Sequence, residues 1–446
     1  MRPYKVLLFI AGVLACLAAL CWVLPGRVRL GATEVRWPSL AEVFGGEQEE
    51  EEEGEALDTL EVLDTLEVLD SLEVIDTLAV PDTIVPEEPR VVVPKVVVDS
   101  TTDSRVFLRD FYAALETAGE TKVRVIHYGD SQIEEDRMTQ QIREALQQRY
   151  GGSGVGLMPL AQTIPTRTVR QELRMNGRVI TPQQGPSRYM VYGPKRTQRK
   201  DGLYGVMGQV AIMADSLVSG SEDVIAMCKP QVPSAHYDTW RVFADTTISY
   251  TISGDTVHLT GRGAVYGLSQ ETDTGVIVDN IPMRGCLGTV FTKMDSAQLV
   301  TFYQTENVQL IIMQFGGNAI PYNEKPETIR GFVKGYKEQI RYLRSCAPGV
   351  NILFIGPSDM IRIKDGVWQS YPMVAYMDKL LRKLSLEEGF AYFSLYEWMG
   401  GAGSMERWKD NGLAGNDGVH FFRSGARKAG NAVAEWILEG KVKGEK

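Results

Sequence analysis

The sequence predicts an α/β protein in which a parallel sheet, with helices on both faces, is interrupted by an inserted all-β module. Two observations lead to this fold class. Short apolar runs alternate with helical patterns over residues 99–164 and again over 275–446, which is the order of a parallel sheet. Between these regions, runs of β-branched and aromatic residues are separated by turn residues, as in antiparallel strands.

The N-terminal segment predicts a membrane anchor at residues 1–26. Arg2 and Lys5 precede nineteen apolar residues, Val6–Leu24, close to the roughly 20 that a membrane-spanning helix needs. This run is longer than the roughly 7–15 residues in the core of a cleaved signal peptide. It also continues past Cys16, which argues against a lipoprotein processing site there. We expect an uncleaved anchor in the inner membrane, with the bulk of the protein periplasmic (extracytoplasmic).

Residues 27–98 predict an acidic low-complexity linker. Eighteen acidic residues and no Lys or Arg lie between Ala41 and Glu88, and six-residue repeats such as Leu57–Val62 occur there. A six-residue period fits neither the helical period of 3.6 nor the heptad of a coiled coil. Because the net charge from residue 99 onward is only +2, nothing indicates a nucleic-acid partner.

The elements of the α/β part begin with a helical pattern near Phe107–Leu115. The near-continuous apolar run Val308–Phe315 is typical of a strand buried on both faces. Strands are further expected at Val123–Tyr128, Asn351–Ile355 and Phe390–Ser394, and helices at Ile133–Tyr150, Ile329–Ser345, Tyr371–Glu388 and Ser424–Glu439.

Residues 165–274 predict the inserted module. Its expected strands are Arg188–Tyr192, Thr239–Phe243, Ile248–Ile252 and Val257–Thr260, with a hairpin turn at Gly254-Asp255. Trp240, Tyr250 and Tyr266 are candidates for stacking on sugars, although aromatic residues in a β module more often belong to its core.

Ser131 is the candidate nucleophile. It follows a β-rich run at a tight turn, Gly129-Asp130-Ser131, into a helical pattern. Such a turn exposes the hydroxyl at the carboxyl edge of the sheet, where open α/β folds place their chemistry. Helix capping by Asp130 or Ser131 is the alternative, so the assignment depends on partners elsewhere in the chain.

A serine nucleophile needs a base and a carboxylate that orients the base. Of the four histidines, His420 lies three residues after Asp417 in a loop before the last helix. In this spacing the carboxylate can fold back on the imidazole and fix its tautomer. His127 precedes the nucleophile in its strand, and His236 and His258 fall in the β module. A surface residue beside a helix is the alternative for His420.

An oxyanion needs hydrogen-bond donors from neighbouring strand ends. Asn318 offers a side-chain amide after the strand Val308–Phe315, and Gly285 offers a backbone N–H without a side chain in the way. Glycine and asparagine are also common turn residues, so each position alone is a weak indication.

In chain order, Gly129–Gln132, Gly285, Gly316–Asn318 and Asp417–His420 resemble the SGNH (GDSL-type) hydrolase family. The resemblance covers about residues 99–160 and 275–440 and implies a flavodoxin-like sheet. It implies that Ser131 is the nucleophile and the first oxyanion donor, through its backbone N–H. Gly285 and Asn318 are then the other two donors, His420 the base and Asp417 its carboxylate.

Two positions depart from the pattern of that family. Gln132 stands where Leu is common, which is harmless for the mechanism. Ala319 follows Asn318 where an acidic residue is usual, which leaves open what supports Asn318. Gly285 is preferred over Gly288 because Asp279–Gly285 resembles the family's Asp-x-x-Gly-x-x-Gly run.

A β module inserted in a membrane-tethered chain is similar to a subgroup of bacterial peptidoglycan O-acetylesterases, whose insert resembles a carbohydrate-binding jelly roll. The resemblance implies a serine esterase that removes O-acetyl groups from a cell-envelope polysaccharide through an acetyl-enzyme. Acetyl transfer to an envelope glycan, and glycan binding without catalysis, remain as alternatives. No metal or cofactor is expected, and the five cysteines have neither metal-ligand nor disulfide spacing.

Overall fold

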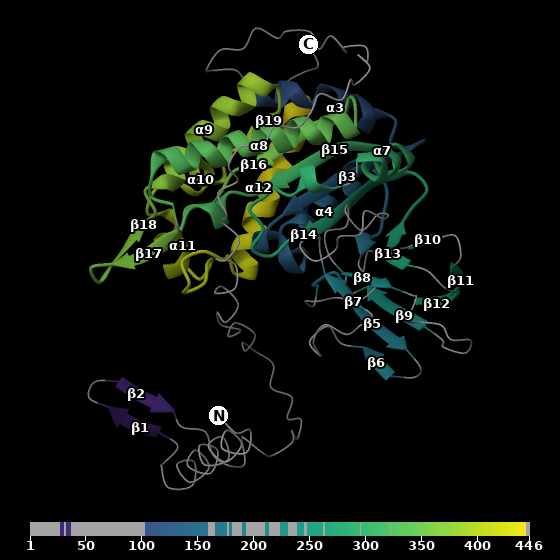
Figure 1. Cartoon of the computed structure of the whole chain (residues 1–446), viewed down its shortest axis with the longest axis horizontal. Coiled ribbons are helices and arrows are strands. Elements are labelled where there is room, and N and C mark those ends of the chain that lie inside the picture. Colours follow the sequence, from purple (N-terminus) through teal and green to yellow (C-terminus); the bar gives the residue numbers. More distant parts are fainter. Residues whose placement is uncertain are drawn as a thin grey trace, which may run out of the picture. The chain divides into compact units, whose positions relative to one another are not determined.

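The central sheet consists of five parallel strands. They are β3 (Lys122–Gly129), β14 (Gly275–Pro282), β15 (Val308–Gln314), β16 (Asn351–Ile355) and β19 (Ala391–Phe393). Their order across the sheet is β14-β3-β15-β16-β19 (Figure 1). Counted along the chain, this is the flavodoxin-like order 2-1-3-4-5, which confirms the predicted fold class.

This computed structural model describes residues 27–30, 33–36, 103–158, 166–175, 178–180, 190–192, 210–213, 224–230, 239–244, 248–261, 264–294, 296–321 and 323–442.

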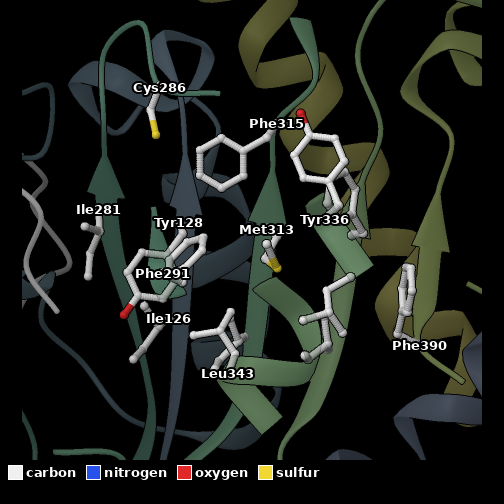
Figure 2. Packing of buried hydrophobic residues seen from close by; sticks show 14 of the residues in the cluster. Ile126, Tyr128, Ile281, Cys286, Phe291, Met313, Phe315, Tyr336, Leu343 and Phe390 are labelled. Atoms are coloured by element: carbon white, nitrogen blue, oxygen red, sulfur yellow. The ribbon is translucent and has the colours of Figure 1, made fainter. Parts of the chain in front are cut away.

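Helices cover both faces of the parallel sheet, as predicted. Side chains alternate between the faces along each strand, so Val125 and Ile126 of β3 belong to different apolar clusters. One cluster includes α3 (Arg109–Glu116), α4 (Thr139–Tyr150) and α12 (Arg423–Val442). The other includes α7 (Ser296–Thr305), α8 (Pro326–Cys346) and α9 (Met373–Glu388). Figure 2 shows Tyr128 of β3 and Met313 of β15 among the residues of this second cluster.

Shorter elements connect the main ones. They are the 3-10 helices η2 (Ser104–Leu108), η3 (Ser131–Asp136), η6 (Phe291–Lys293) and η7 (Gly317–Ala319), the helices α10 (Leu395–Met399) and α11 (Ser404–Asp410), and the hairpin of β17 (Ile361–Lys364) and β18 (Val367–Ser370).

Antiparallel strands form two further sheets between β3 and β14 in the sequence. The first contains β4 (Gly156–Met158), β7 (Met190–Tyr192), β8 (Val210–Met213), β10 (Thr239–Ala244) and β13 (Ala264–Glu271). The second contains β5 (Val169–Met175), β6 (Arg178–Ile180), β9 (Val224–Pro230), β11 (Ile248–Ser253) and β12 (Thr256–Gly261). The predicted hairpin turn at Gly254-Asp255 joins β11 to β12. The domain boundaries and the jelly-roll topology stay predictions.

The N-terminal part of the chain forms a separate unit, Met1–Val92. Within it, β1 (Arg27–Leu30) pairs antiparallel with β2 (Thr33–Arg36), a hairpin not foreseen in the predicted linker. The predicted anchor and the six-residue repeats lie outside the described residues. Among the residues that are described, no helix combines the length and the apolar character needed to cross a bilayer.

The predicted continuous helix Ile133–Tyr150 is wrong at its start. The chain first makes the irregular turn η3, and α4 begins only at Thr139. Glu134 has an extended ψ of 158°, and Glu135 and Asp136 have φ values of 60° and 62°. Because a left-handed backbone cannot continue a right-handed helix, these residues delay the helix. The side-chain pattern alone could not show this.

A buried cluster of charges fastens β3 to β14 and to the antiparallel strand β13. Arg124 of β3 donates to both carboxylate oxygens of Asp279 on β14, at 2.8 and 2.9 Å. The same guanidinium contacts Glu271 of β13, and it lies 3.2 Å from Glu306. Arg241 of β10 donates to Glu271 at 2.9 Å and to Glu306 at 2.8 Å. Since buried charges need partners, this cluster fixes the first antiparallel sheet against the parallel sheet.

Replacing Glu271 with Gln should lower the free energy of unfolding by an amount that depends on pH. Burial alone would raise the pKa of Glu271, but Arg124, Lys122 and Arg241 lower it to about 2. Its ionised form therefore stabilises the fold above pH 4.5, and this contribution is lost as the pH falls toward 2. We expect E271Q to lower the free energy of unfolding at pH 7 by about 3 kcal/mol, with a smaller difference at pH 3.5.

Urea denaturation followed by circular dichroism measures both values. E387Q, in an exposed pair of α9, is the control and should leave stability nearly unchanged. An equal loss for E271Q at both pH values would contradict the electrostatic explanation.

Candidate active site

The turn that consists of Asp130 and η3 follows β3 directly, and we call it the nucleophile turn after the predicted role of Ser131. Asp130 caps it, because its carboxylate accepts a hydrogen bond from the Gln132 N–H at 3.0 Å. Ser131 then opens η3 with a half-buried side chain. The predicted capping role therefore belongs to Asp130, which leaves the Ser131 hydroxyl available for a different partner.

That partner is His420. The Ser131 Oγ lies 2.8 Å from His420 Nε2, and His420 Nδ1 lies 2.6 Å from Asp417 Oδ2. A carboxylate only accepts hydrogen bonds, so Nδ1 carries the proton and Nε2 is left to accept from the serine hydroxyl. The structure thus brings together the three residues predicted as nucleophile, base and orienting carboxylate, although they are almost 300 residues apart.

Asp417 is held in its ionised form. Burial raises its pKa, but the hydrogen bond from His420 and those from the backbone N–H groups of Val419 and His420 outweigh burial and hold the pKa below its ordinary value. Its Oδ1 accepts from the two backbone groups at 2.9 and 3.0 Å. A permanently charged Asp417 can stabilise the imidazolium that forms when His420 accepts a proton.

Gln132 joins the nucleophile turn to the loop of residues 417–420, termed the histidine loop. Its Nε2 donates to the Val419 carbonyl at 2.6 Å, next to His420 in the sequence. A leucine at this position has no hydrogen-bonding group, so the departure from the family pattern adds a contact across the site. Sequence reasoning treated Gln132 as harmless, and its polarity was the only available signal.

The two candidate oxyanion glycines differ in their surroundings. The Gly288 N–H lies 3.3 Å from the Cys286 sulfur, and an added Cβ would lie 2.6 Å from Phe315. Gly285 is exposed, and an added Cβ would meet nothing within 4 Å. Within the described residues, no hydrogen bond engages the backbone N–H of Gly285 or of Ser131. The geometry thus favours Gly285, whose role stays a prediction.

Asn318 lies beside both Asp130 and the loop of residues 283–288, termed the oxyanion loop after the predicted role of Gly285. Its Nδ2 donates to Asp130 Oδ2 and to the Cys286 carbonyl, each at 3.2 Å. Asp130 therefore supplies the support that Ala319 cannot give. Both bonds are long, and one would have to be released or shared for Asn318 to donate to an oxyanion, as its predicted role requires. Burial raises the pKa of Asp130 to about 6, partly offset by the Gln132 N–H and by His420.

The remaining predicted candidates lie elsewhere. His127 is fully buried between Gln314 and Thr139, and burial lowers its pKa to about 3 despite the bond to Gln314. His258 lies on β12, and His236 is outside the described residues. Trp240 is buried, which favours a core role, whereas Tyr250 is 47% exposed. The Tyr266 side chain is not among those described. No three His, Cys, Asp or Glu side chains of the described ranges could hold a metal ion together.

Comparisons with known proteins agree with the fold. No family model matches the sequence. No curated protein matches it either. A solved structure of a peptidoglycan O-acetylesterase superimposes with a TM-score of 0.59 at 19% identity, covering 77% of this chain and 98% of that chain. The chain has the fold of the SGNH hydrolases.

Two further solved structures match a smaller part of the chain. A carbohydrate acetylesterase from Sinorhizobium meliloti is 14% identical and covers 37% of this chain and 79% of its own, with a TM-score of 0.27. The periplasmic domain of a lipopolysaccharide acetyltransferase from Salmonella ser. Paratyphi A is 11% identical and covers 37% of this chain and 72% of its own, with a TM-score of 0.26.

Alanine substitutions should separate the two glycines of this SGNH fold. Both have positive φ, 66° at Gly285 and 77° at Gly288, which costs an alanine about 1–2 kcal/mol. G288A must also displace Phe315, so we expect it to lower the free energy of unfolding by about 3 kcal/mol in total. G285A should lose only the backbone part. Urea denaturation measures both, and equal losses would contradict the assignment of Gly288 to packing.

Proposed function

We propose that this protein is a serine esterase that removes O-acetyl groups from a cell-envelope polysaccharide of the peptidoglycan type. The observation that carries the proposal is the continuous hydrogen-bonded chain from Asp417 through His420 to Ser131. Two backbone N–H groups are engaged by no other described group: that of Ser131 itself, and that of Gly285, whose loop is bonded to the end of β3 through the Met283 N–H and the Gly129 carbonyl. This arrangement suits acyl transfer through a covalent intermediate.

The geometry supports the following reaction. Ser131 Oγ attacks the acetyl carbonyl carbon while its proton passes to His420 Nε2, and Asp417 stabilises the resulting imidazolium. The developing oxyanion is stabilised by the N–H groups of Ser131 and Gly285 and by the Asn318 amide. His420 then gives its proton to the departing glycan hydroxyl. In the second half, His420 deprotonates a water, which attacks the acetyl carbon. The bond to Ser131 Oγ breaks, acetate leaves, and His420 returns the proton to Ser131.

A polysaccharide substrate is supported by the extent of the structural likeness. It covers 98% of a peptidoglycan O-acetylesterase, a protein whose name states both the ester and the polymer. The likeness takes in more than the parallel sheet, because 77% of this chain is included. On this basis we propose that acetylated peptidoglycan, or a related envelope glycan, is the substrate.

Ser131→Ala should abolish acetate release. Removal of the nucleophile typically costs about 10³-fold or more, so S131A should release no measurable acetate from O-acetylated peptidoglycan in a coupled acetate assay. S296A, at an exposed serine on α7, is the matched control and should keep the wild-type rate. Full activity of S131A would refute the assignment.

Two further measurements, of acetyl groups on a glycan and of glycan binding, separate the alternatives. Acetyl groups appearing on a deacetylated glycan supplied with an acetyl donor would indicate a transferase, and glycan binding without any turnover would indicate a binding protein.

We further propose that residues 1–26 anchor the protein in the inner membrane with its catalytic part in the periplasm. The support is the apolar run Val6–Leu24 behind Arg2 and Lys5. The full chain should stay in the membrane pellet after carbonate extraction, whereas a variant without residues 1–26 should be released. Release of the full chain would contradict the anchor.

A further inference from the structure

Glu134 connects the nucleophile turn to the oxyanion loop. It lies three residues after Ser131, and its carboxylate is almost fully buried. Arg284 grips it with two parallel bonds, from Nε to Oε1 at 2.8 Å and from Nη2 to Oε2 at 2.7 Å. Bidentate pairs of this kind fix direction as well as distance. Arg284 immediately precedes Gly285, so the contact ends at the peptide that carries the proposed oxyanion donor.

The backbone around Glu134 is shaped to make this contact. Its extended ψ of 158° and the left-handed φ of Glu135 turn it away from the path of a helix. Two successive left-handed residues without glycine are costly, and they persist only where surrounding contacts fix them. Here Arg167 donates to the Glu135 carboxylate at 3.0 Å, and Arg143 binds Asp136 at 2.5 and 3.0 Å.

Three consecutive carboxylates therefore each bind an arginine from a different segment. Arg143 lies on α4, Arg167 lies at the start of the antiparallel strands, and Arg284 lies on the oxyanion loop. The Arg143–Asp136 and Arg167–Glu135 pairs hold the turn in place. The Arg284–Glu134 pair links the turn to the residue before Gly285.

Gly285 is held on both sides, while no described group engages its own N–H. On one side, the Met283 N–H donates to the Gly129 carbonyl at 2.8 Å and Arg284 binds Glu134. On the other, the Cys286 carbonyl accepts from Asn318. The Gly285 N–H belongs to the peptide plane that begins at Arg284, so the position of Arg284 sets the direction in which this N–H points.

We propose that Glu134 is a positioning residue for the esterase reaction: through Arg284 it aims the Gly285 N–H at the oxyanion. This inference rests on the proposed function. An oxyanion donor acts only where charge develops in the transition state. Loss of the Glu134–Arg284 pair should therefore slow turnover without weakening substrate binding, whereas loss of a merely structural ion pair would change stability and leave turnover intact.

The test uses the full chain with 4-nitrophenyl acetate, a substrate too small to depend on glycan contacts. E134Q keeps the shape of the side chain, and R284Q alters an exposed one. Each should lower kcat about tenfold to a hundredfold, part of the cost of losing a whole donor, with KM within about twofold. R284K, which keeps the charge without the fork, should retain an intermediate kcat.

A double variant and a control sharpen the result. E134Q/R284Q should be no slower than the slower single variant, because both substitutions remove one and the same contact. Arg341 binds Glu388 in the same bidentate way, at 2.8 and 3.0 Å, between α8 and α9. R341Q is therefore the matched control and should keep the wild-type kcat.

Two outcomes would count against the inference in different ways. Wild-type protein without esterase activity would overturn the proposed function and this inference with it. Active wild-type protein whose E134Q and R284Q variants keep full kcat, or lose only KM, would overturn this inference alone. Thermal unfolding of each variant confirms that the compared proteins are folded.

Discussion

The pairing of β3 with β14 on one side and β15 on the other is the constraint on which the site depends. All three strands run parallel, and Gly129 at the end of β3 is level with Pro282 of β14 and Gln314 of β15. Their carboxyl ends therefore meet at one edge, although β3 is 153 residues from β14 and 186 from β15 in sequence, counted between first residues. A slip by one residue would turn every side chain to the other face, and the Arg124–Asp279 pair opposes such a slip.

The histidine loop reaches this edge by a different kind of contact. It does not continue a strand of the sheet, and it is placed by individual bonds to its neighbours. Gln132 donates to Val419, and the Ile361 N–H donates to the Gly418 carbonyl at 2.9 Å. Gly418 must be a glycine, because its φ is +69° and an added Cβ would lie 2.6 Å from Ile361. The distance of 2.8 Å between Ser131 and His420 thus depends on loop packing as much as on the sheet.

The amino-acid sequence was sufficient to predict the candidate site residues, which depend on side-chain chemistry, and the buried strands, which depend on the pattern of apolar residues. Ser131, Asp417 and His420 stood out by their order along the chain and by the scarcity of histidine, of which the sequence has four. Buried strands such as β15 are visible as apolar runs. The irregular turn after Ser131 was missed because left-handed Glu135 and Asp136 leave no mark in side-chain pattern. β14 was not predicted as a strand, since only three residues separate it from β13 and both are β-rich. The contacts of Gln132 and Glu134 join distant segments, which no local pattern reveals.

The carboxylates of the nucleophile turn are paired with arginines from other segments, and the charges around Ser131 explain why. Ser131 is followed by three carboxylates and preceded by Asp130, and uncompensated negative charge there would oppose a developing oxyanion. Arg284, Arg167 and Arg143 neutralise the three that follow. Asp130 has no arginine among its described hydrogen-bond partners; it is held by the Gln132 N–H and Asn318, and burial raises its pKa to about 6. Its charge therefore remains largely in place at neutral pH, beside Asn318. Among the described residues, the turn thus combines three carboxylates paired with arginines and one, Asp130, that is held by neutral hydrogen-bond donors.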